Sequence, residues 1–192
     1  MLWLITKITQ KIESWASEVD LFYKIVESYY RNVVEKEVVL ANITKDDNIL
    51  FIGGGICPFS AILLHRKTGA KITVIDNDAS CVNKARQVIN RMELSGYVTV
   101  LFRDGRDVGL TLSAYTVVHF ALQICPLECV FSYVEKHVIP GTKLLIRRPR
   151  KQLKKLYRDS FRHLPSILRF CPFTMHRQTR NIGSTLMYIK ES

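Results

Sequence analysis

The pattern of hydrophobic positions changes once along the chain, close to residue 48. Upstream, residues 5 to 40 contain no Gly or Pro, and their apolar side chains recur at helical spacing. This pattern predicts two amphipathic helices with a break near Ser17 to Asp20. Their apolar positions are Ile5, Ile8, Ile12, Trp15 and Val19, then Leu21, Phe22, Ile25, Val26, Tyr29 and Val33.

From residue 48 onwards, short apolar runs alternate with helical patterns. The runs lack strict apolar/polar alternation, which is typical of strands that helices cover on both faces. Strands and helices in this order predict a doubly wound α/β fold with a mostly parallel sheet. The expected strands are 48–53, 71–76, 97–102, 114–120 and 142–148, and the expected helices are 58–68, 79–94 and 126–138; Gly69, Gly96 and Pro140-Gly141 mark returns from helix to strand.

The end of the chain departs from this order. A helix is expected near 150–163, followed by two β-like runs at about 166–176 and 184–190. Two strands without an intervening helix pair antiparallel at a sheet edge, which brings the expected sheet to seven strands. We therefore expect a Rossmann-like domain over residues 46–192, preceded by a short N-terminal helical leader or lid over residues 1–45.

A glycine-rich turn follows the first expected strand. Gly53-Gly54-Gly55 let the backbone turn sharply and approach a ligand closely, and Pro58 opens the next helix. Asp76 ends the second expected strand with Asn77 behind it, where an acidic side chain accepts hydrogen bonds from ribose hydroxyls. This arrangement predicts an adenosine-containing cofactor at the carboxyl edge of the sheet; the alternative is a tight turn without a ligand.

The residues around this turn distinguish between cofactors. A dinucleotide loop carries a third glycine where this chain has Pro58, and the sequence contains no phosphate-binding G-x-x-x-x-G-K-[ST] loop. S-adenosylmethionine has no phosphate and needs only close passage of its methionine moiety and ribose. Asp104-Gly105, after the third expected strand, can accept a hydrogen bond from an adenine amino group, although Asp104 is equally explained as a helix cap. The predicted cofactor is S-adenosylmethionine.

Charge and cysteine content indicate which binding partners and which cellular compartment to expect. The net charge is +11, and much of it lies in the basic block 147–158. Such a block is explained by a solvated helix face or by attraction to nucleic acid, to an anionic membrane or to a small acidic substrate. No RNA-binding aromatic motif accompanies it, so nucleic acid is the runner-up, and no membrane partner is expected. Five cysteines without paired spacing argue against a structural metal, and the absence of a signal peptide favours a cytoplasmic protein.

Several polar side chains follow the fourth and fifth expected strands, where a substrate of such a fold would bind. His119 can contact the cofactor or act as a base, or it can be a core histidine with satisfied nitrogens. Gln123 is a candidate substrate contact. Arg147 and Arg148, with Arg150, can clamp a carboxylate or phosphate on the substrate.

Three segments resemble a known family. The glycine loop, Val74-Ile75-Asp76-Asn77-Asp78 and Phe102-Arg103-Asp104-Gly105 resemble the class I S-adenosylmethionine-dependent methyltransferases. Within that class, the chain is most similar to the nicotianamine synthases and their archaeal relatives. The likeness covers about residues 40 to 190 and is carried by Phe51–Leu64, by Val117–Leu122 with Ile139–Arg147, and by Asn181–Ile189.

The resemblance implies a reaction that the fold alone does not specify. Nicotianamine synthases transfer the aminocarboxypropyl arm of the cofactor to an amine and release methylthioadenosine. Their catalytic Glu and Tyr would correspond to Glu27 with Tyr29 or Tyr30 in the leader, where an aromatic packing stripe is the alternative. The leading prediction is methyl transfer to a small-molecule acceptor. Aminocarboxypropyl transfer, RNA methylation and a non-catalytic adenosyl-binding domain are the alternatives, and the apolar leader is a candidate homodimer interface.

Overall fold

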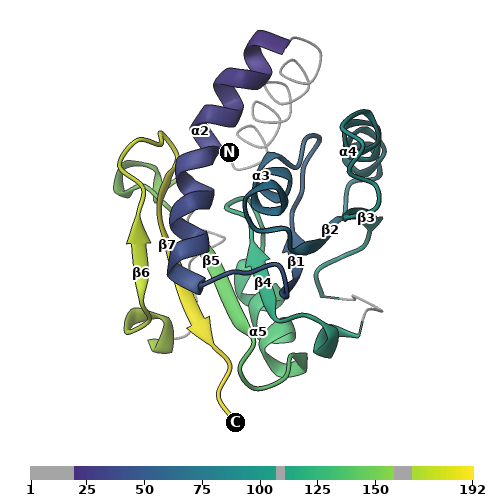
Figure 1. Ribbon diagram of the computed structural model, residues 1–192. Coiled ribbons are helices and arrows are strands. Elements are labelled where there is room, and N and C mark those ends of the chain that lie inside the picture. Colours follow the sequence, from purple (N-terminus) through teal and green to yellow (C-terminus); the bar gives the residue numbers. More distant parts are fainter. Residues whose placement is uncertain (1–19, 107–110, 158–165) are drawn as a thin grey trace.

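The computed structural model describes residues 20–106, 111–157 and 166–192 as one α/β unit (Figure 1). Its sheet has seven strands in the order β3-β2-β1-β4-β5-β7-β6. The first five strands pair in parallel, whereas β7 pairs antiparallel with both β5 and β6. The strands are β1 (Asn48–Ile52), β2 (Lys71–Asp76), β3 (Val98–Phe102), β4 (Val117–Phe120), β5 (Lys143–Pro149), β6 (Phe173–Met175) and β7 (Ile182–Ile189).

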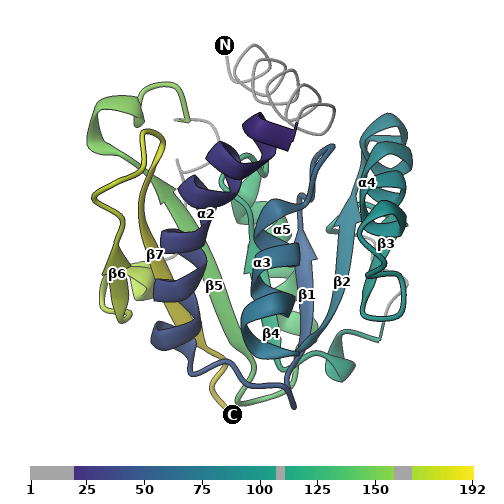
Figure 2. The same ribbon diagram turned by 45° about the horizontal axis from the view of Figure 1, so that its top comes forward.

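Helices cover both faces of the sheet (Figures 1 and 2). On one face, α2 (Asp20–Ala41), α3 (Phe59–Thr68) and α4 (Ala79–Arg91) pack over Ile49 and Phe51 of β1. On the other face, α5 (Leu127–His137) packs over Leu50 and Ile52. Successive β1 side chains point to opposite faces, so every one of these four residues is buried. This explains why the strands read as continuous apolar runs.

The predicted doubly wound fold with its seven-stranded, mostly parallel sheet is confirmed, including the antiparallel edge. The tail differs in detail. The helix expected near 150–163 is a short 3₁₀ turn, Lys151–Leu153, with residues 158–165 outside the described part. The expected strand 166–176 begins as another 3₁₀ turn, Ser166–Arg169, because Leu168 is buried in the core on the α5 side; only Phe173–Met175 pair as a strand. The first leader helix also lies outside the described residues.

Helix α2 packs as part of this fold. Its Val34 and Ala41 belong to the core that α3 and α4 build, and Val33 belongs to a smaller cluster with Leu122 and Ile182. Figure 2 shows α2 crossing the sheet obliquely above β5 and β7. Within the described residues, no helix is both long enough and apolar enough to cross a membrane.

Substitutions on α2 test whether it belongs to the cooperative unit. Val34 is buried, whereas Val39, on the opposite side of the same helix, is 81% exposed. Val34→Ala should lower the free energy of unfolding by about 2 kcal/mol, because two buried methyl groups are lost and a cavity remains. Val39→Ala is the matched control, and urea denaturation measures both. Equal stabilities of the two variants would mean that α2 is a separable leader.

Candidate functional site

A cavity of about 380 Å³ opens at the carboxyl ends of the parallel strands. In doubly wound folds this edge is where ligands bind, because loops from several strands meet there. The lining residues come from α2, from the loops after β1, β2, β3 and β4, from the start of α3, from α5, from the end of β5 and from the start of β7. They include Tyr30, Gly53, Gly54, Gly55, Pro58, Phe59, Ser60, Asp76, Asn77, Asp104, Gly105, Arg106, Gln123, Arg147 and Asn181.

The glycine turn needs its glycines for two separate reasons. Gly53 and Gly55 have φ of 84° and 63°, a left-handed conformation that side chains disfavour. A Cβ on Gly54 would lie 2.2 Å from Cγ1 of the buried Val74, so no side chain fits there. The turn therefore passes tightly over β2 and leaves the cavity open above it.

Asp76 is oriented by the backbone around it. Its carboxylate accepts hydrogen bonds from the N–H of Gly55 at 2.8 Å and of Asp78 at 3.0 Å. Burial raises the pKa of Asp76, and these N–H donors oppose that rise. Because a carboxylate has about four acceptor positions, Asp76 can accept further hydrogen bonds from a ligand in the cavity.

Asp104 and Gly105, in the loop after β3, also line the cavity, but the Asp104 carboxylate already has a partner. Arg106 donates to Asp104 from its side chain at 2.9 Å, through both Nε and Nη2. This interaction lowers the pKa of Asp104. The Asp104–Arg106 ion pair is partly exposed, so replacing it with a contact to a ligand costs little free energy. A Cβ on Gly105 would lie 2.7 Å from Cγ1 of Val130, which explains the glycine beside Asp104.

The far end of the cavity is aromatic and polar. The ring of Tyr30 stacks on Phe59 with centroids 6.1 Å apart, and the Arg147 guanidinium lies 5.9 Å from the Tyr30 centroid. Asn181, at the entry to β7, accepts a hydrogen bond from the Tyr29 hydroxyl. Helix α2 thus supplies the side wall at this end.

Beneath this wall lies a buried ionic network centred on Glu37 of α2. Arg147 donates to both carboxylate oxygens, each at 2.8 Å, and its Nη1 donates to Ser60 at 2.9 Å. His119 Nε2 lies 3.1 Å from Glu37 Oε2, and the Thr185 hydroxyl donates to Oε1 at 2.6 Å. Four donors therefore surround one fully buried carboxylate.

The charges in this network balance. Burial alone would raise the pKa of Glu37, but Arg147 and His119 hold it well below its usual range. Burial lowers the pKa of His119, and this outweighs the opposing attraction of Glu37, so the imidazole is neutral. One carboxylate and one guanidinium remain, and their bidentate pairing offsets the cost of removing both from water.

A second histidine extends the network. His176 Nε2 lies 2.8 Å from the Thr185 hydroxyl, which in turn donates to Glu37. Burial lowers the pKa of His176 to about 4. Both buried imidazoles are therefore neutral at physiological pH and act as hydrogen-bond donors from Nε2.

Most of the residues expected at a cofactor site do line this one cavity: Gly53, Gly54, Gly55, Pro58, Asp76, Asn77, Asp104, Gly105, Gln123, Arg147 and Tyr30. Their roles stay predictions. Within the described residues, no group of three His, Cys, Asp or Glu side chains is placed to hold a metal ion.

Three expected site residues lie elsewhere. His119 is fully buried, stacked on Phe51 with centroids 4.2 Å apart, as the core alternative expects, but of its two nitrogens only Nε2 has a hydrogen-bond partner among the described residues. Glu27 faces Arg31 and Arg66 at 3.6 Å each and does not line the cavity. Arg148 is half-buried on β5, opposite Ser184 of β7.

The arginines that were expected to hold a substrate bind mainly to other groups of the protein. Arg147 lines the cavity, but its charge is already balanced by Glu37. Arg150 donates from Nη2 to the backbone carbonyl of Arg177. Sequence reasoning missed Glu37, although a signal was present: Glu37 continues the helical stripe of Val26, Tyr30 and Val33, and a carboxylate on an apolar stripe indicates a buried partner.

Comparisons with known proteins agree with this geometry. The family model described as Nicotianamine synthase protein matches residues 22–164. No curated protein matches the sequence. Among solved structures, a variant of MtNAS in complex with S-adenosylmethionine superposes with a TM-score of 0.73 at 18% identity, covering 98% of this chain and 74% of that one.

Two methyltransferases show the same fold. An RNA methyltransferase from Salinibacter ruber, bound to S-adenosyl-L-homocysteine, gives a TM-score of 0.62 at 18% identity, with 84% of this chain and 92% of that one covered. Geranyl diphosphate C-methyltransferase from Streptomyces coelicolor A3(2) gives a TM-score of 0.55 at 14% identity, with 66% of this chain and 51% of that one covered. At these identities the likeness concerns the fold.

An alanine at the glycine turn tests the close approach to β2. Gly54→Ala should lower the free energy of unfolding by about 1–3 kcal/mol, because the added Cβ overlaps the stiff Val74 side chain. Gly96→Ala is the control, since no heavy atom lies within 4 Å of its Cβ position. Urea denaturation compares them, and an equally stable Gly54→Ala variant would contradict the packing described here.

The buried imidazoles predict a pH-dependent stability. The folded-state pKa of His176 is about 4, below the unfolded value near 6.5, so only the unfolded chain takes up a proton between these values. The free energy of unfolding should therefore fall as the pH is lowered from 6.5 towards 4. His176→Gln should reduce this dependence, measured by urea denaturation at pH 7.5, 6 and 5. His137→Gln, which replaces an exposed imidazole, is the control, and an unchanged slope in His176→Gln would contradict the prediction.

Proposed function

The chain belongs to the nicotianamine synthase family, and we propose that it transfers the aminocarboxypropyl arm of S-adenosylmethionine to a nucleophile bound beside α2. The cofactor prediction is confirmed, because this family uses S-adenosylmethionine. The observation that carries the proposed reaction is a single cavity with two different ends. The glycine turn and Asp76 form one end, and Tyr30, Arg147 and Asn181 form the other.

The residues present fit an adenosyl ligand. The cavity of about 380 Å³ is within the range of small-molecule sites. The positions nearest the expected methionine moiety and adenine are glycines with no room for a side chain, Gly54 and Gly105. Asp76 keeps acceptor positions for ribose hydroxyls, and no phosphate-binding loop is present to suggest a nucleotide.

S-adenosylmethionine supplies a sulfonium centre whose attached carbons are already activated towards a nucleophile. The protein therefore contributes mainly position and proton handling. Asp76 would hold the ribose, and Asp104 would hold the adenine amino group after releasing Arg106. Which carbon faces the other end of the cavity depends on how these contacts rotate the ligand.

The end of the cavity that Tyr30, Arg147 and Asn181 form, which we call the acceptor end, offers a fixed hydrogen-bond donor and a phenol. Three of the five Arg147 N–H groups are used by Glu37 and Ser60, which leaves two for a carboxylate of the arm or the acceptor. The Tyr30 hydroxyl is the candidate to orient the attacking nucleophile by a hydrogen bond, and the proton that the nucleophile loses would pass to solvent. Asn181, on the wall beside it, can orient the acceptor.

Methyl transfer is the second candidate. The observation that favours it is the fold shared with methyltransferases, including the one from Salinibacter ruber. The two reactions need the same cofactor site and differ in the carbon presented to Tyr30 and Arg147, so the fold supports both.

The released nucleoside distinguishes the candidates. Purified protein is incubated with S-adenosylmethionine and a small-molecule extract, and the nucleosides are identified by mass spectrometry. Methylthioadenosine above the no-protein control is the expected product, and S-adenosylhomocysteine would mean methyl transfer instead. Asp76→Ala should lose cofactor affinity by roughly tenfold or more, because a ribose contact to a charged group is removed.

Two further variants separate binding from chemistry. Tyr30→Phe should keep cofactor affinity while the rate of nucleoside release falls by about 10²-fold, as expected when a hydrogen bond that positions the nucleophile is lost. Lys71→Gln, at the opposite edge of the sheet, is the control. Calorimetric binding of S-adenosylmethionine with no product of either kind across varied acceptors would contradict an enzymatic function.

A further inference from the structure

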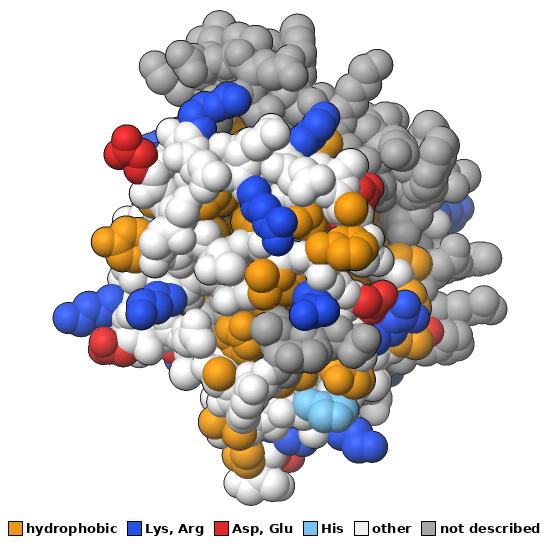
Figure 3. Space-filling view, turned by 90° about the vertical axis from the view of Figure 1, so that its right-hand side faces the viewer, with side chains coloured by type: hydrophobic (Ala, Val, Ile, Leu, Met, Phe, Trp, Pro, Cys, Tyr) orange, Lys and Arg blue, Asp and Glu red, His pale blue; other side chains and the backbone are white. Residues whose placement is uncertain are grey.

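The excess of positive over negative charge lies in one part of the chain. Residues 136–190 contain fourteen Lys and Arg residues and a single acidic residue, Asp159. The remainder of the chain is slightly acidic. By contrast, the face formed by α4 and β3 carries scattered basic side chains with acidic ones among them (Figure 3). The excess charge thus belongs to the end of α5, to β5 and above all to the segments that follow β5.

Five exposed cations of this region form what we call the basic rim: Lys151, Lys154, Lys155, Arg177 and Arg180. Two loops carry them, and backbone contacts join these loops. The N–H of Arg150 donates to the carbonyl of Asn181 at 2.9 Å, and the Arg150 guanidinium donates to the carbonyl of Arg177. None of the five forms an ion pair with a carboxylate of the described residues.

The basic rim lies at the acceptor end of the cavity. Tyr157, just after Lys155, is buried in a cluster with Val33, Leu122 and Ile182. Leu122 and Ile182 line the cavity, and Asn181 follows Arg180 directly. A ligand held along the rim would therefore pass the cavity wall that Tyr30 and Asn181 form.

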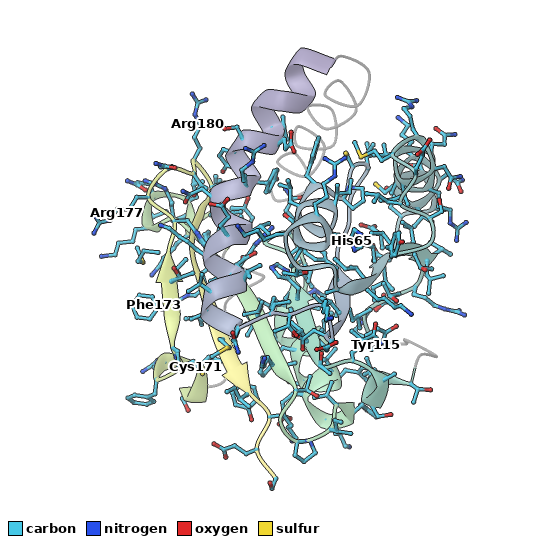
Figure 4. All side chains as sticks on the ribbon, viewed as in Figure 1. His65, Tyr115, Cys171, Phe173, Arg177 and Arg180 are labelled. Carbon is cyan, nitrogen blue, oxygen red and sulfur yellow. The ribbon has the colours of Figure 1, made fainter. Side chains whose placement is uncertain are left out.

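Exposed aromatic and apolar side chains continue the rim along β6. Phe173 is 58% exposed and Met175 51%, two residues apart on the same side of the edge strand; Phe170, just before them, is 89% exposed. Figure 4 shows Phe173 and Arg177 pointing outwards, away from α2. Cations beside exposed rings are the combination that single-stranded nucleic acid uses, with phosphates on the charges and bases stacked on the rings.

We infer that the basic rim and the outer side of β6 form a binding surface for single-stranded nucleic acid. A second copy of the chain is a poorer occupant, because it would bring the same uncompensated positive charges together. Duplexes are also poorer occupants, because their bases are stacked on one another and cannot stack on Phe173. This surface is separate from the cofactor site and does not depend on which group the protein transfers.

Fluorescence anisotropy with a labelled, unstructured 20-nucleotide RNA tests the inference. We expect binding at 50 mM KCl that weakens steeply with salt. The triple variant K151E/K154E/K155E should bind at least about tenfold more weakly at 100 mM KCl, and its salt slope should be less negative by about 2, as expected when three phosphate contacts are lost. K45E/K67E/K71E is the matched control, with the same charge change among exposed lysines at the opposite edge of the sheet.

Substitutions of Phe173 provide a second, independent test of RNA binding. Phe173→Ala should weaken RNA binding about tenfold, and Phe173→Trp should retain it, because stacking needs only a ring face. Three results would overturn the inference: no RNA binding at 50 mM KCl, equal losses in the two triple variants, or a dimer in light scattering that Phe173→Ala dissociates.

The cofactor site supplies the control that separates this inference from the proposed function. Asp76→Ala should lose S-adenosylmethionine in calorimetry and still bind the RNA. K151E/K154E/K155E should keep cofactor affinity while RNA binding falls. Loss of both ligands in both variants would mean that the two surfaces are not separate, which would overturn the inference.

Discussion

The buried pair of Glu37 and Arg147 is the constraint on which the rest of this structure depends. Either charge alone in the core would be strongly destabilising, so the fold must bring both together and supply further hydrogen-bond partners for them. His119, Thr185 and Ser60 do so from β4, β7 and the start of α3. A helix near one end of the chain is thereby fixed to strands more than a hundred residues away.

The same pair shapes the cavity. Arg147 reaches the cavity wall because Glu37 holds its guanidinium, and Tyr30 lies two helical turns before Glu37 on the same side of α2. The acceptor end is therefore assembled only when α2 is docked. The glycine turn and Asp76, in contrast, are built from adjacent strands and need no contribution from α2. The two ends of the cavity thus arise from different levels of the structure.

The basic residues after β5 divide into two groups with different physical roles. Arg147 and Arg150 donate inwards, to a carboxylate and to backbone carbonyls, and so contribute to the arrangement of the sheet edge. The lysines that follow, Lys151, Lys154 and Lys155, remain exposed on a segment that Tyr157 anchors beside the cavity. A continuous run of positive charge in the sequence therefore separates into an internal network and an external surface.

Local residue patterns were sufficient for most strands and helices, the antiparallel edge and the glycine turn, since each depends on burial period, on glycine conformation or on a side chain at a strand end. They were insufficient for the tail near 150–176 and for the acceptor end. The apolar stripe on α2 marks Glu37 as facing inwards, but nothing local names its partner or distinguishes Arg147 from Arg148. Only folding placed Glu37 against Arg147 and moved His119 into the core, because the partner that makes a buried charge stable is set by tertiary packing and not by sequence neighbours.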